Sequence, residues 1–300
     1  MNRKVIPFAG DSNFTKELKG LVHTLSQSNA SVLLVGEKGT GKKLFAQHLH
    51  SDVSKDFSDF FEINCKSFHA EQILSVFNDI GKIELSGQRI TLYVSFIDDL
   101  SGELQQLFLE LIDNSLKRGV NLKIISSVED SLKSKVNNGL FLPDLYYRLN
   151  AIVLNMLPLN HRKDDILPIA KMYFSNFKKK SGIRFEDFSD EAKQMMVSHL
   201  WVGNIDELIN SIQRAFIVGI PPMITPDDLG LFHQYSFGID YDDKNDRSLK
   251  SALHAFKKEY LTKLLKENGW NQTKTAKILG IQRTYVIRLM NELHIQKEKI

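Results

Sequence analysis

The sequence lacks a second cysteine and any long apolar run, and each absence excludes a class of protein. Cys65 is the single cysteine, so no internal disulfide can form, and one thiol cannot make a cysteine-rich zinc site. We expect Cys65 to be a small buried side chain. No apolar stretch approaches the roughly 18 residues that a membrane helix requires, and residues 1–10 have no signal-peptide core. These features predict a cytoplasmic protein without membrane contact.

Histidine gives no sign of a metal centre or a hydrolase site. The nine histidines show no spacing typical of metal ligands, and chain order alone suggests no Ser-His-Asp set. We therefore assign no catalytic residue and no metal ligand.

The chain has the composition of an ordinary globular protein, but its charge is unevenly distributed along the sequence. At 300 residues, 42% apolar and 25% charged, the chain can form two or three domains with hydrophobic cores. The net charge is only +3, yet residues 249–300 carry eleven Lys or Arg against four Glu. This basic end predicts a polyanionic partner. A solvated, lysine-rich helical tail is the alternative.

The first half alternates strand-like and helical patterns, which predicts an α/β fold with a mostly parallel sheet. The strands are expected at 31–36, 91–96 and 122–128, and helices at 42–50 and 103–119. The second of these helices repeats its apolar positions with a 3.6-residue period. We assign this α/β nucleotide-binding domain to residues 1–160.

The second half is expected to be helical. Residues 161–234 predict an all-helical lid, in which Thr225 has the features of a helix cap, followed by Pro226 and two acids in the first turn. Residues 235–247 are polar, acidic and without apolar periodicity, which predicts a linker. A compact helical unit follows at 248–300.

A phosphate-binding loop is the strongest local motif. The segment LLVGEKGTGKK has P-loop spacing and lies between a predicted strand and a predicted helix. Its glycines let consecutive backbone N–H groups surround phosphate oxygens, and its first lysine, Lys42, can reach the terminal phosphates. A glycine-rich turn with exposed lysines is the alternative. The predicted nucleotide-binding residues are Gly36, Glu37, Lys38, Gly39, Thr40, Gly41, Lys42 and Lys43.

One position of this loop departs from the strict motif. Lys43 stands where a serine or threonine normally contacts magnesium. We therefore expect ATP or ADP as the ligand and leave Mg²⁺ open.

Several motifs in order resemble a known family. They are AGDSN, SVLLVGEKGTGKK, FEINCKSF, TLYVSFIDDLSGELQ, LKIISSVEDSL, FLPDLYYRLNAIVLNMLPLNHRKDDI and LWVGNIDELINSIQRA. From Gly10 to Phe232 the chain resembles the AAA+ domain of bacterial enhancer-binding proteins, the sigma-54-dependent activators. The segment NQTKTAKILGIQRTYVIRLMNELHI resembles the Fis-type helix-turn-helix that usually ends such proteins.

The resemblance implies a fold and partners. The fold would be an AAA+ P-loop domain with a parallel sheet, a helical lid and a C-terminal all-α helix-turn-helix. It implies a bacterial cytoplasmic regulator that binds double-stranded DNA as a homodimer or higher homo-oligomer. Because the resemblance begins at Gly10, we expect no receiver or sensory domain before it.

The segment TLYVSFIDDLSGELQ departs from the family at its acidic pair. Aligned without gaps, the family's Asp-Glu falls on Ser95 and Phe96. A serine offers at best a neutral oxygen to a metal, and a phenylalanine cannot activate water. A shift of three residues restores an acidic pair at Asp98 and Asp99 after a longer strand, but loses most later matches. We favour the ungapped alignment.

Other departures concern groups that would meet the nucleotide. By resemblance, the asparagine that orients water is Glu129, and the arginine that approaches the nucleotide is Asp206, whose carboxylate would repel phosphate. Of two arginines expected to reach a neighbouring subunit's ATP, the first is Leu142 and the second remains as Arg148. Because charge stabilisation supplies most of phosphoryl-transfer catalysis, these changes predict weak or absent hydrolysis.

The segment that contacts sigma-54 in the family is also missing. The family has a longer segment between the residues that match Cys65 and Thr91, and this segment carries a Gly-Ala-Phe-Thr-Gly-Ala loop that the chain lacks. The resemblance therefore predicts that sigma-54 is not a partner. Contact with RNA polymerase stays open.

The basic end has the pattern of a helix-turn-helix, with helices from Thr273 and Arg283 and a turn at Gly280. The second helix is the expected recognition helix. A three-helix bundle without DNA contact is the alternative. The positions expected to pack the pair are Ala276, Ile278, Leu279, Ile281, Val286 and Leu289. The predicted DNA-binding residues are Thr273, Lys274, Gln282, Arg283, Thr284, Tyr285 and Arg288.

An apolar stripe precedes this motif and predicts a dimer contact. Its members are Leu249, Leu253, Phe256, Tyr260, Leu261, Leu264 and Leu265.

Three functions follow from these patterns. The leading hypothesis is a DNA-binding transcription regulator whose degenerate AAA+ domain binds ATP or ADP and hydrolyses it poorly. The first alternative is a working ATPase that uses Asp98 and Asp99. The second is a nucleotide-free scaffold that presents the helix-turn-helix.

Overall fold

The computed structural model of the chain divides into two units, Met1–Leu231 and Phe232–Ile300. The described residues are 6–53, 59–67, 69–83, 89–182, 185–231, 257–258, 260–262, 264–266, 268–293 and 295. The predicted linker at 235–247 lies outside them. No helix within the described part of the chain is long and apolar enough to cross a membrane.

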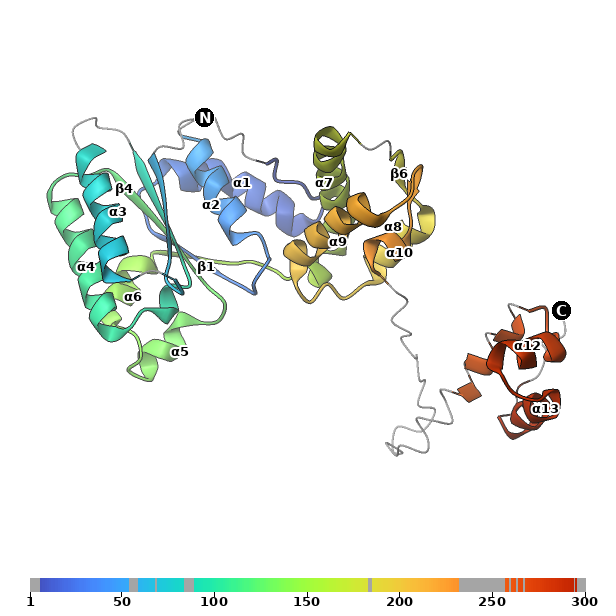
Figure 1. Ribbon diagram of the computed structural model, residues 1–300. Helices are drawn as coiled ribbons and strands as arrows, with labels where there is room; N and C mark the ends of the chain where they lie inside the picture. The colour runs from blue at the N-terminus through green and yellow to red at the C-terminus, as the bar shows by residue number, and fades with distance from the viewer. Residues whose placement is uncertain are drawn as a thin grey trace. The chain divides into compact units, whose positions relative to one another are not determined.

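A five-stranded parallel sheet forms the centre of the first unit (Figure 1). Its strand order is β2-β3-β4-β1-β5, and every neighbouring pair is parallel. The strands are β1 (Val32–Val35), β2 (Phe60–Asn64), β3 (Ile90–Ser95), β4 (Leu122–Val128) and β5 (Ile152–Asn155). All seven residues of β4 are buried, as expected for a central strand of a parallel sheet. The predicted α/β fold is confirmed.

Helices cover both faces of this sheet (Figure 1). One face packs against four helices, α3 (Ala70–Ile83), α4 (Gly102–Lys117), α5 (Leu132–Asn137) and α6 (Pro143–Leu149). The other face packs against α1 (Asn13–Gln27) and α2 (Lys42–Ser51). The helices after β1 and β3 therefore form where the sequence predicts them.

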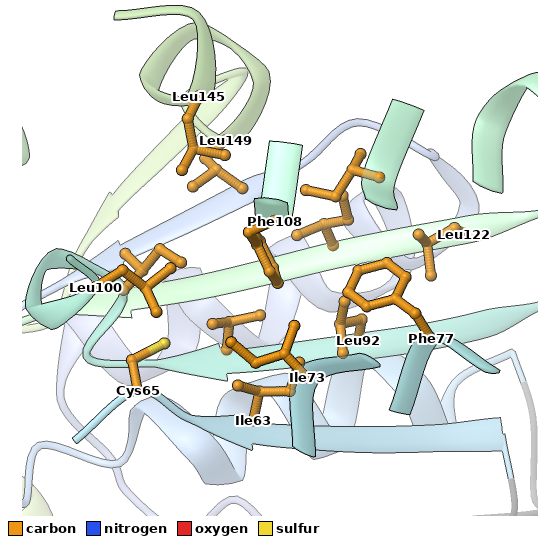
Figure 2. Close-up of a cluster of buried hydrophobic side chains, with 14 of the residues drawn as sticks. Ile63, Cys65, Ile73, Phe77, Leu92, Leu100, Phe108, Leu122, Leu145 and Leu149 are labelled. Carbon is orange, nitrogen blue, oxygen red and sulfur yellow. The ribbon is translucent and has the colours of Figure 1, made fainter. Parts of the chain in front are cut away.

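The core under α3 and α4 is rich in branched and aromatic side chains. Figure 2 shows Phe77 and Phe108 over the sheet, close to Leu92 and Leu122. The two phenylalanine rings meet edge to face, with centroids 5.6 Å apart. Cys65 is 7% exposed in the same core, which confirms the small buried role expected for it. Burial raises the pKa of this thiol to about 12.

A buried lysine fixes the end of α1 against the sheet. Lys123 lies near the amino end of β4 and is 2% exposed. Its Nζ donates to the carbonyls of Leu25, Ser28 and Ala30 at 2.7, 2.8 and 2.9 Å. Burial, with a smaller contribution from Arg89, lowers the pKa of Lys123 to about 8. This cation caps carbonyls at the helix end and so has a structural role.

The lid completes the first unit. It begins with two short 3-10 helices, η4 (Leu159–His161) and η5 (Lys163–Asp165). Its helices are α7 (Ile166–Ser181), α8 (Asp190–Ser198), α9 (Asn204–Val218) and α10 (Pro226–Leu229). The predicted cap of α10 is confirmed, because the Asp228 N–H donates to the Thr225 hydroxyl while the Thr225 N–H donates to the Asp228 carboxylate.

The prediction of an all-helical lid is wrong in one respect. Two short strands, β6 (Asp187–Phe188) and β7 (Met223–Ile224), pair in parallel. Strands of two residues are too short to show an alternating apolar pattern, so they have no recognisable signal in the sequence.

The second unit contains the expected helix pair, α12 (Gln272–Leu279) and α13 (Arg283–Glu292). Gly280 joins them with a left-handed backbone, φ 65°. The buried core consists of Leu261, Leu265, Ala276, Val286, Leu293 and Ile295.

Two expectations about this unit are wrong. We expected Leu261 and Leu265 on an exposed stripe for dimerisation, but their side chains are 3% and 0% exposed. They are buried because two short helices need a third apolar surface to close their core. Ile278, expected to pack the pair, is 55% exposed. It follows the buried Ala276 by two residues, which places it on the opposite side of the helix. Leu249, Leu253 and Phe256 lie outside the described residues.

Candidate functional site

A cavity of about 560 Å³ lies beside the loop that joins β1 to α2. The loop and the start of α2 contribute Lys38, Gly39 and residues 41–43, and the carboxyl ends of β2, β3 and β4 contribute polar side chains. The lid contributes residues of α7 and α9. Ligands of parallel α/β sheets bind at the carboxyl ends of the strands, so this is the expected place for a nucleotide. The lining side chains with charge or hydrogen-bonding groups are Lys38, Lys42, Lys43, Gln47, Glu62, Asn64, Tyr93, Ser95, Ser127, Tyr173 and Asp206.

The glycines of the loop are required by close approaches. Gly36 has φ 155°, and a Cβ there would lie 2.5 Å from the carbonyl oxygen of Met156. Gly39 has φ 78°, and a Cβ there would lie 2.3 Å from the carbonyl oxygen of Gly203 in the lid. Gly41 has φ 95° and is the N-cap of α2. The predicted loop therefore forms between the strand and the helix, and the start of α9 (Asn204–Val218) in the lid packs against it.

Two lid residues hold the loop from outside. The Asn204 Nδ2 donates to the Glu37 carboxylate and to the Lys38 carbonyl, both at 3.0 Å. The buried Arg162 donates to the Thr40 carbonyl at 2.7 Å. The motif around Asn204 can be recognised in the sequence. The loop residues that Asn204 and Arg162 contact lie more than 100 positions away, so no local sequence pattern indicates these contacts.

A buried carboxylate ties the same lid segment to the start of α1. Asp165 is 0% exposed and lies 3.8 Å from Arg162. It accepts hydrogen bonds from the Ser12 N–H and hydroxyl at 2.7 and 2.8 Å and from the Thr15 hydroxyl at 2.7 Å. Buried charges need such partners, and here the partners join two segments that are about 150 positions apart in sequence.

Lys42 lies back on its own loop. Its Nζ donates to the carbonyl of Glu37 at 2.8 Å and also to the carbonyl of Gly36. Burial lowers the pKa of Lys42, and the carboxylates of Glu129 and then Asp206 oppose that shift. A phosphate oxygen is a stronger acceptor than a carbonyl, so this ammonium group can exchange the loop for a ligand.

Lys43 points to a neighbouring strand. Its Nζ lies 2.5 Å from the Glu62 Oε2, and both residues line the cavity. The position that carries a magnesium-binding hydroxyl in the strict motif therefore holds an ion pair. Lys43 stands out in the sequence as a departure from the motif, but Glu62 does not, since the two are 19 positions apart.

The end of β3 has no carboxylate. The strand ends at Ser95, and Phe96 follows in a left-handed conformation, φ 56°, which turns the chain into the 3-10 helix η3 (Ile97–Asp99). Ser95 and Phe96 line the cavity. The longer strand that the alternative alignment requires does not form.

The two aspartates of η3 are each held by a lysine. Asp98 accepts from the Lys135 Nζ at 2.7 Å, and the same ammonium donates to the Asp98 carbonyl at 2.9 Å. Asp99 lies 3.8 Å from the Lys66 Nζ. Lys66 also lies 3.6 Å from Glu129, which follows β4. Neither lysine was singled out from the sequence, because nothing in the local pattern links residues 37 positions apart.

The two positions of the expected arginine pair lie at α6, away from the cavity. Leu142 is the residue before this helix, and its N–H donates to the Gln105 side chain at 2.8 Å. Arg148 donates to the Asp113 carboxylate of α4 at 2.5 Å. Arg148 is thus paired within its own chain.

The helix-turn-helix presents its predicted contacts to solvent. The seven predicted DNA-binding residues are all exposed. They are Thr273, Lys274, Gln282, Arg283, Thr284, Tyr285 and Arg288. Asn271 caps α12 by accepting the Lys274 N–H at 3.1 Å, while Val286 faces the core. The exposed side of α13 can therefore enter a groove without disturbing the packing.

Three protein families match successive parts of the chain. Residues 9–159 match the Sigma-54 interaction domain, residues 160–236 match the AAA+ ATPase lid domain, and residues 252–293 match the Bacterial regulatory protein, Fis family. The predicted resemblance is confirmed.

Known relatives share this arrangement over most of the chain. The transcriptional regulatory protein ZraR of Klebsiella oxytoca is 28% identical over 296 residues, which cover 91% of this chain and 66% of that protein. The regulatory protein AtoC of Escherichia coli K12 is 28% identical over 295 residues, covering 90% and 64%. The chain thus spans about two thirds of the length of these relatives.

A solved structure supports the fold. The crystal structure of NtrX from Brucella abortus in complex with ATP matches with a TM-score of 0.63 and 22% identity, over 95% of this chain and 69% of that chain. At this identity the match shows the fold alone.

The contact between Gly39 and the lid can be tested with a matched glycine. Gly39→Ala should destabilise the folded protein more than Gly119→Ala, because both positions have positive φ but only Gly39 has a backbone atom in the way. The left-handed backbone alone costs about 1–2 kcal/mol for alanine, so Gly119→Ala should lose that much and Gly39→Ala clearly more. Urea unfolding followed by circular dichroism measures both. Equal losses would contradict the close approach.

Proposed function

This chain belongs to the family of the sigma-54 interaction domain, and we propose that it is a DNA-binding transcription regulator. In this proposal its AAA+ unit binds ATP or ADP, hydrolyses it poorly and does not activate sigma-54. The observation that carries the proposal is the end of β3. There Ser95 and Phe96 take the place of the acidic pair, and Asp98 is engaged by Lys135.

Nucleotide binding is supported by the loop and its surroundings. The glycines keep the loop backbone open to the cavity, and Lys42 lies at the start of α2. Backbone N–H groups at a helix start attract phosphate. The related NtrX structures are described as complexes with ATP and with ADP, which makes the same ligands reasonable here.

Poor hydrolysis is supported by the charges around the cavity. A water that attacks phosphate needs a positioned base or orienting group, and the developing charge needs cations. Phe96 offers no oxygen, and Asp206 brings a negative charge into the cavity lining. Arg148, which would serve a neighbouring subunit, is paired with Asp113. Each change removes part of the transition-state stabilisation.

The alternative of a working ATPase that uses Asp98 and Asp99 is less well supported. Asp98 has a side chain only 16% exposed and is held through two bonds by Lys135. To serve a metal it would have to leave this lysine, and breaking a partly buried pair is unfavourable.

The proposal that sigma-54 is not a partner is supported by the short connection before β3. Only the six positions 84–89 separate the last residue of α3 from the first residue of β3 in the sequence. A long contact loop like that of the family has no room in this interval. Transcription from a sigma-54 promoter in a reconstituted reaction, driven by this chain and ATP, would contradict this part of the proposal.

Nucleotide binding can be tested through Lys42. ATP or ADP should raise the melting temperature of the wild-type chain, because a ligand of the folded state stabilises it by mass action. Lys42→Ala should lose most of this increase, since it removes a charge that reaches the phosphates. Lys117→Ala, an exposed lysine at the end of α4, is the matched control and should keep it. An undiminished increase in Lys42→Ala would count against the site, and no increase in any variant would favour the nucleotide-free scaffold.

DNA binding can be tested through Arg283. Arg283→Ala should weaken binding to a selected duplex by about 1–3 kcal/mol if the guanidinium reads a base edge. Arg118→Ala, an exposed arginine after α4, makes the same charge change in the other unit and should have little effect. Fluorescence anisotropy with a labelled duplex measures both. Equal affinities for Arg283→Ala and the wild type would refute the assignment of α13 as the recognition helix.

A further inference from the structure

The donor groups of the cavity do not fit the magnesium ion that accompanies nucleotide in P-loop proteins. We propose that this cavity binds the free nucleoside di- or triphosphate without a divalent cation, and that lysine ammonium groups supply the charge compensation. The inference rests on the proposed nucleotide binding and adds the form of the ligand.

The first missing donor is at the start of α2. Magnesium takes near-octahedral oxygen ligands and is commonly held by one or two protein oxygens together with the phosphates. Lys43 places an ammonium group at the position of the usual hydroxyl, and this group lies 2.5 Å from Glu62. A cation already occupies the space next to the carboxylate that a metal could use.

The second missing donor is at the end of β3. The Ser95 hydroxyl donates to the Ile63 carbonyl at 3.3 Å within the sheet. The Phe96 ring is covered by the Lys66 ammonium, 3.9 Å from the ring centroid. This contact places another positive charge where the acidic pair would attract a metal.

The remaining carboxylates at this edge, Asp98, Asp99 and Glu129, each lie within 4 Å of a lysine ammonium group. Asp98 is bound by Lys135 at 2.7 Å, and Lys66 lies 3.8 Å from Asp99 and 3.6 Å from Glu129. A metal ion would have to displace these lysines and would meet their repulsion. Within the described part of the chain, no group of three or more His, Cys, Asp or Glu could hold a metal ion.

The lysines are placed to take over the metal's role. Three of them line the cavity, Lys38, Lys42 and Lys43, against the carboxylates of Glu62 and Asp206. Lysine binds phosphate as a point charge through charge-assisted hydrogen bonds. When a phosphate group enters, Lys42 can exchange its loop carbonyls for phosphate oxygens, and Lys43 can share its ammonium between Glu62 and the ligand.

The experiment compares ADP and ATP binding in excess Mg²⁺ and in excess EDTA by isothermal titration calorimetry on the full chain. The dissociation constants should agree within about threefold, or be lower in EDTA, because a magnesium ion bound to the phosphates would offset part of the negative charge that attracts the lysines. Binding that is tenfold or more tighter in Mg²⁺ would overturn this inference and leave the proposed nucleotide function standing. Absence of binding in both buffers would refute the proposed nucleotide function and this inference with it.

Three variants, one of them a control, distinguish the role of the Lys43 ammonium group from an effect on folding. Lys43→Ser should weaken binding in EDTA by about tenfold or more, as expected for loss of a charged hydrogen bond. Lys117→Ser, on the exposed end of α4, is the control and should bind like the wild type. The combined variant Lys43→Ser/Ser95→Asp/Phe96→Glu should bind about tenfold more tightly with Mg²⁺ than with EDTA, because it restores oxygen ligands. Unchanged EDTA binding in Lys43→Ser would contradict the role of its ammonium group.

Discussion

The close approach of the P-loop to the beginning of α9 determines the geometry of the cavity. Gly39 has no side chain where the Gly203 carbonyl passes, and the next residue, Asn204, bonds the loop from the lid side. The Ile205 N–H completes the contact by donating to the Gly39 carbonyl at 2.9 Å. This docking fixes the loop backbone for phosphate and places Asp206, in the first turn of α9, in the cavity lining. This one backbone contact therefore positions both the lysines of the loop, which attract a phosphate group, and the carboxylate of Asp206, which repels it.

The fold and the chemistry of this chain depend on different parts of the molecule. The parallel sheet needs only apolar strands and covering helices, and those are intact in β1, β3 and β4. Catalysis in such a fold needs a few charges at the strand ends, where they contribute nothing to the core. Lysines lie along that edge and pair with Glu62, Asp98 and Glu129. The architecture of an AAA+ domain therefore does not depend on the side chains at this edge.

Much of the fold and part of the site could be predicted from the sequence. The P-loop, the strand at 122–128 and the helix pair of the basic end have local signals, because glycine spacing and apolar periodicity are encoded within a few residues. Tertiary partners have no such signal. The sequence shows Asp98 but not that Lys135 binds it, and it shows an apolar stripe but not that Leu261 and Leu265 close a core. The strands β6 and β7 were missed because two residues carry no period.

If the chain holds nucleotide but lacks the groups that cleave it, a single-turnover measurement will find bound ATP uncleaved. The chain in excess is mixed with ATP labelled at the γ-phosphate, bound nucleotide is separated, and its phosphate content is followed over time. We expect bound ATP to be recovered intact over many minutes. Release of labelled phosphate within seconds of binding, at rates of about 1–10³ s⁻¹ typical of enzymes, would contradict the account.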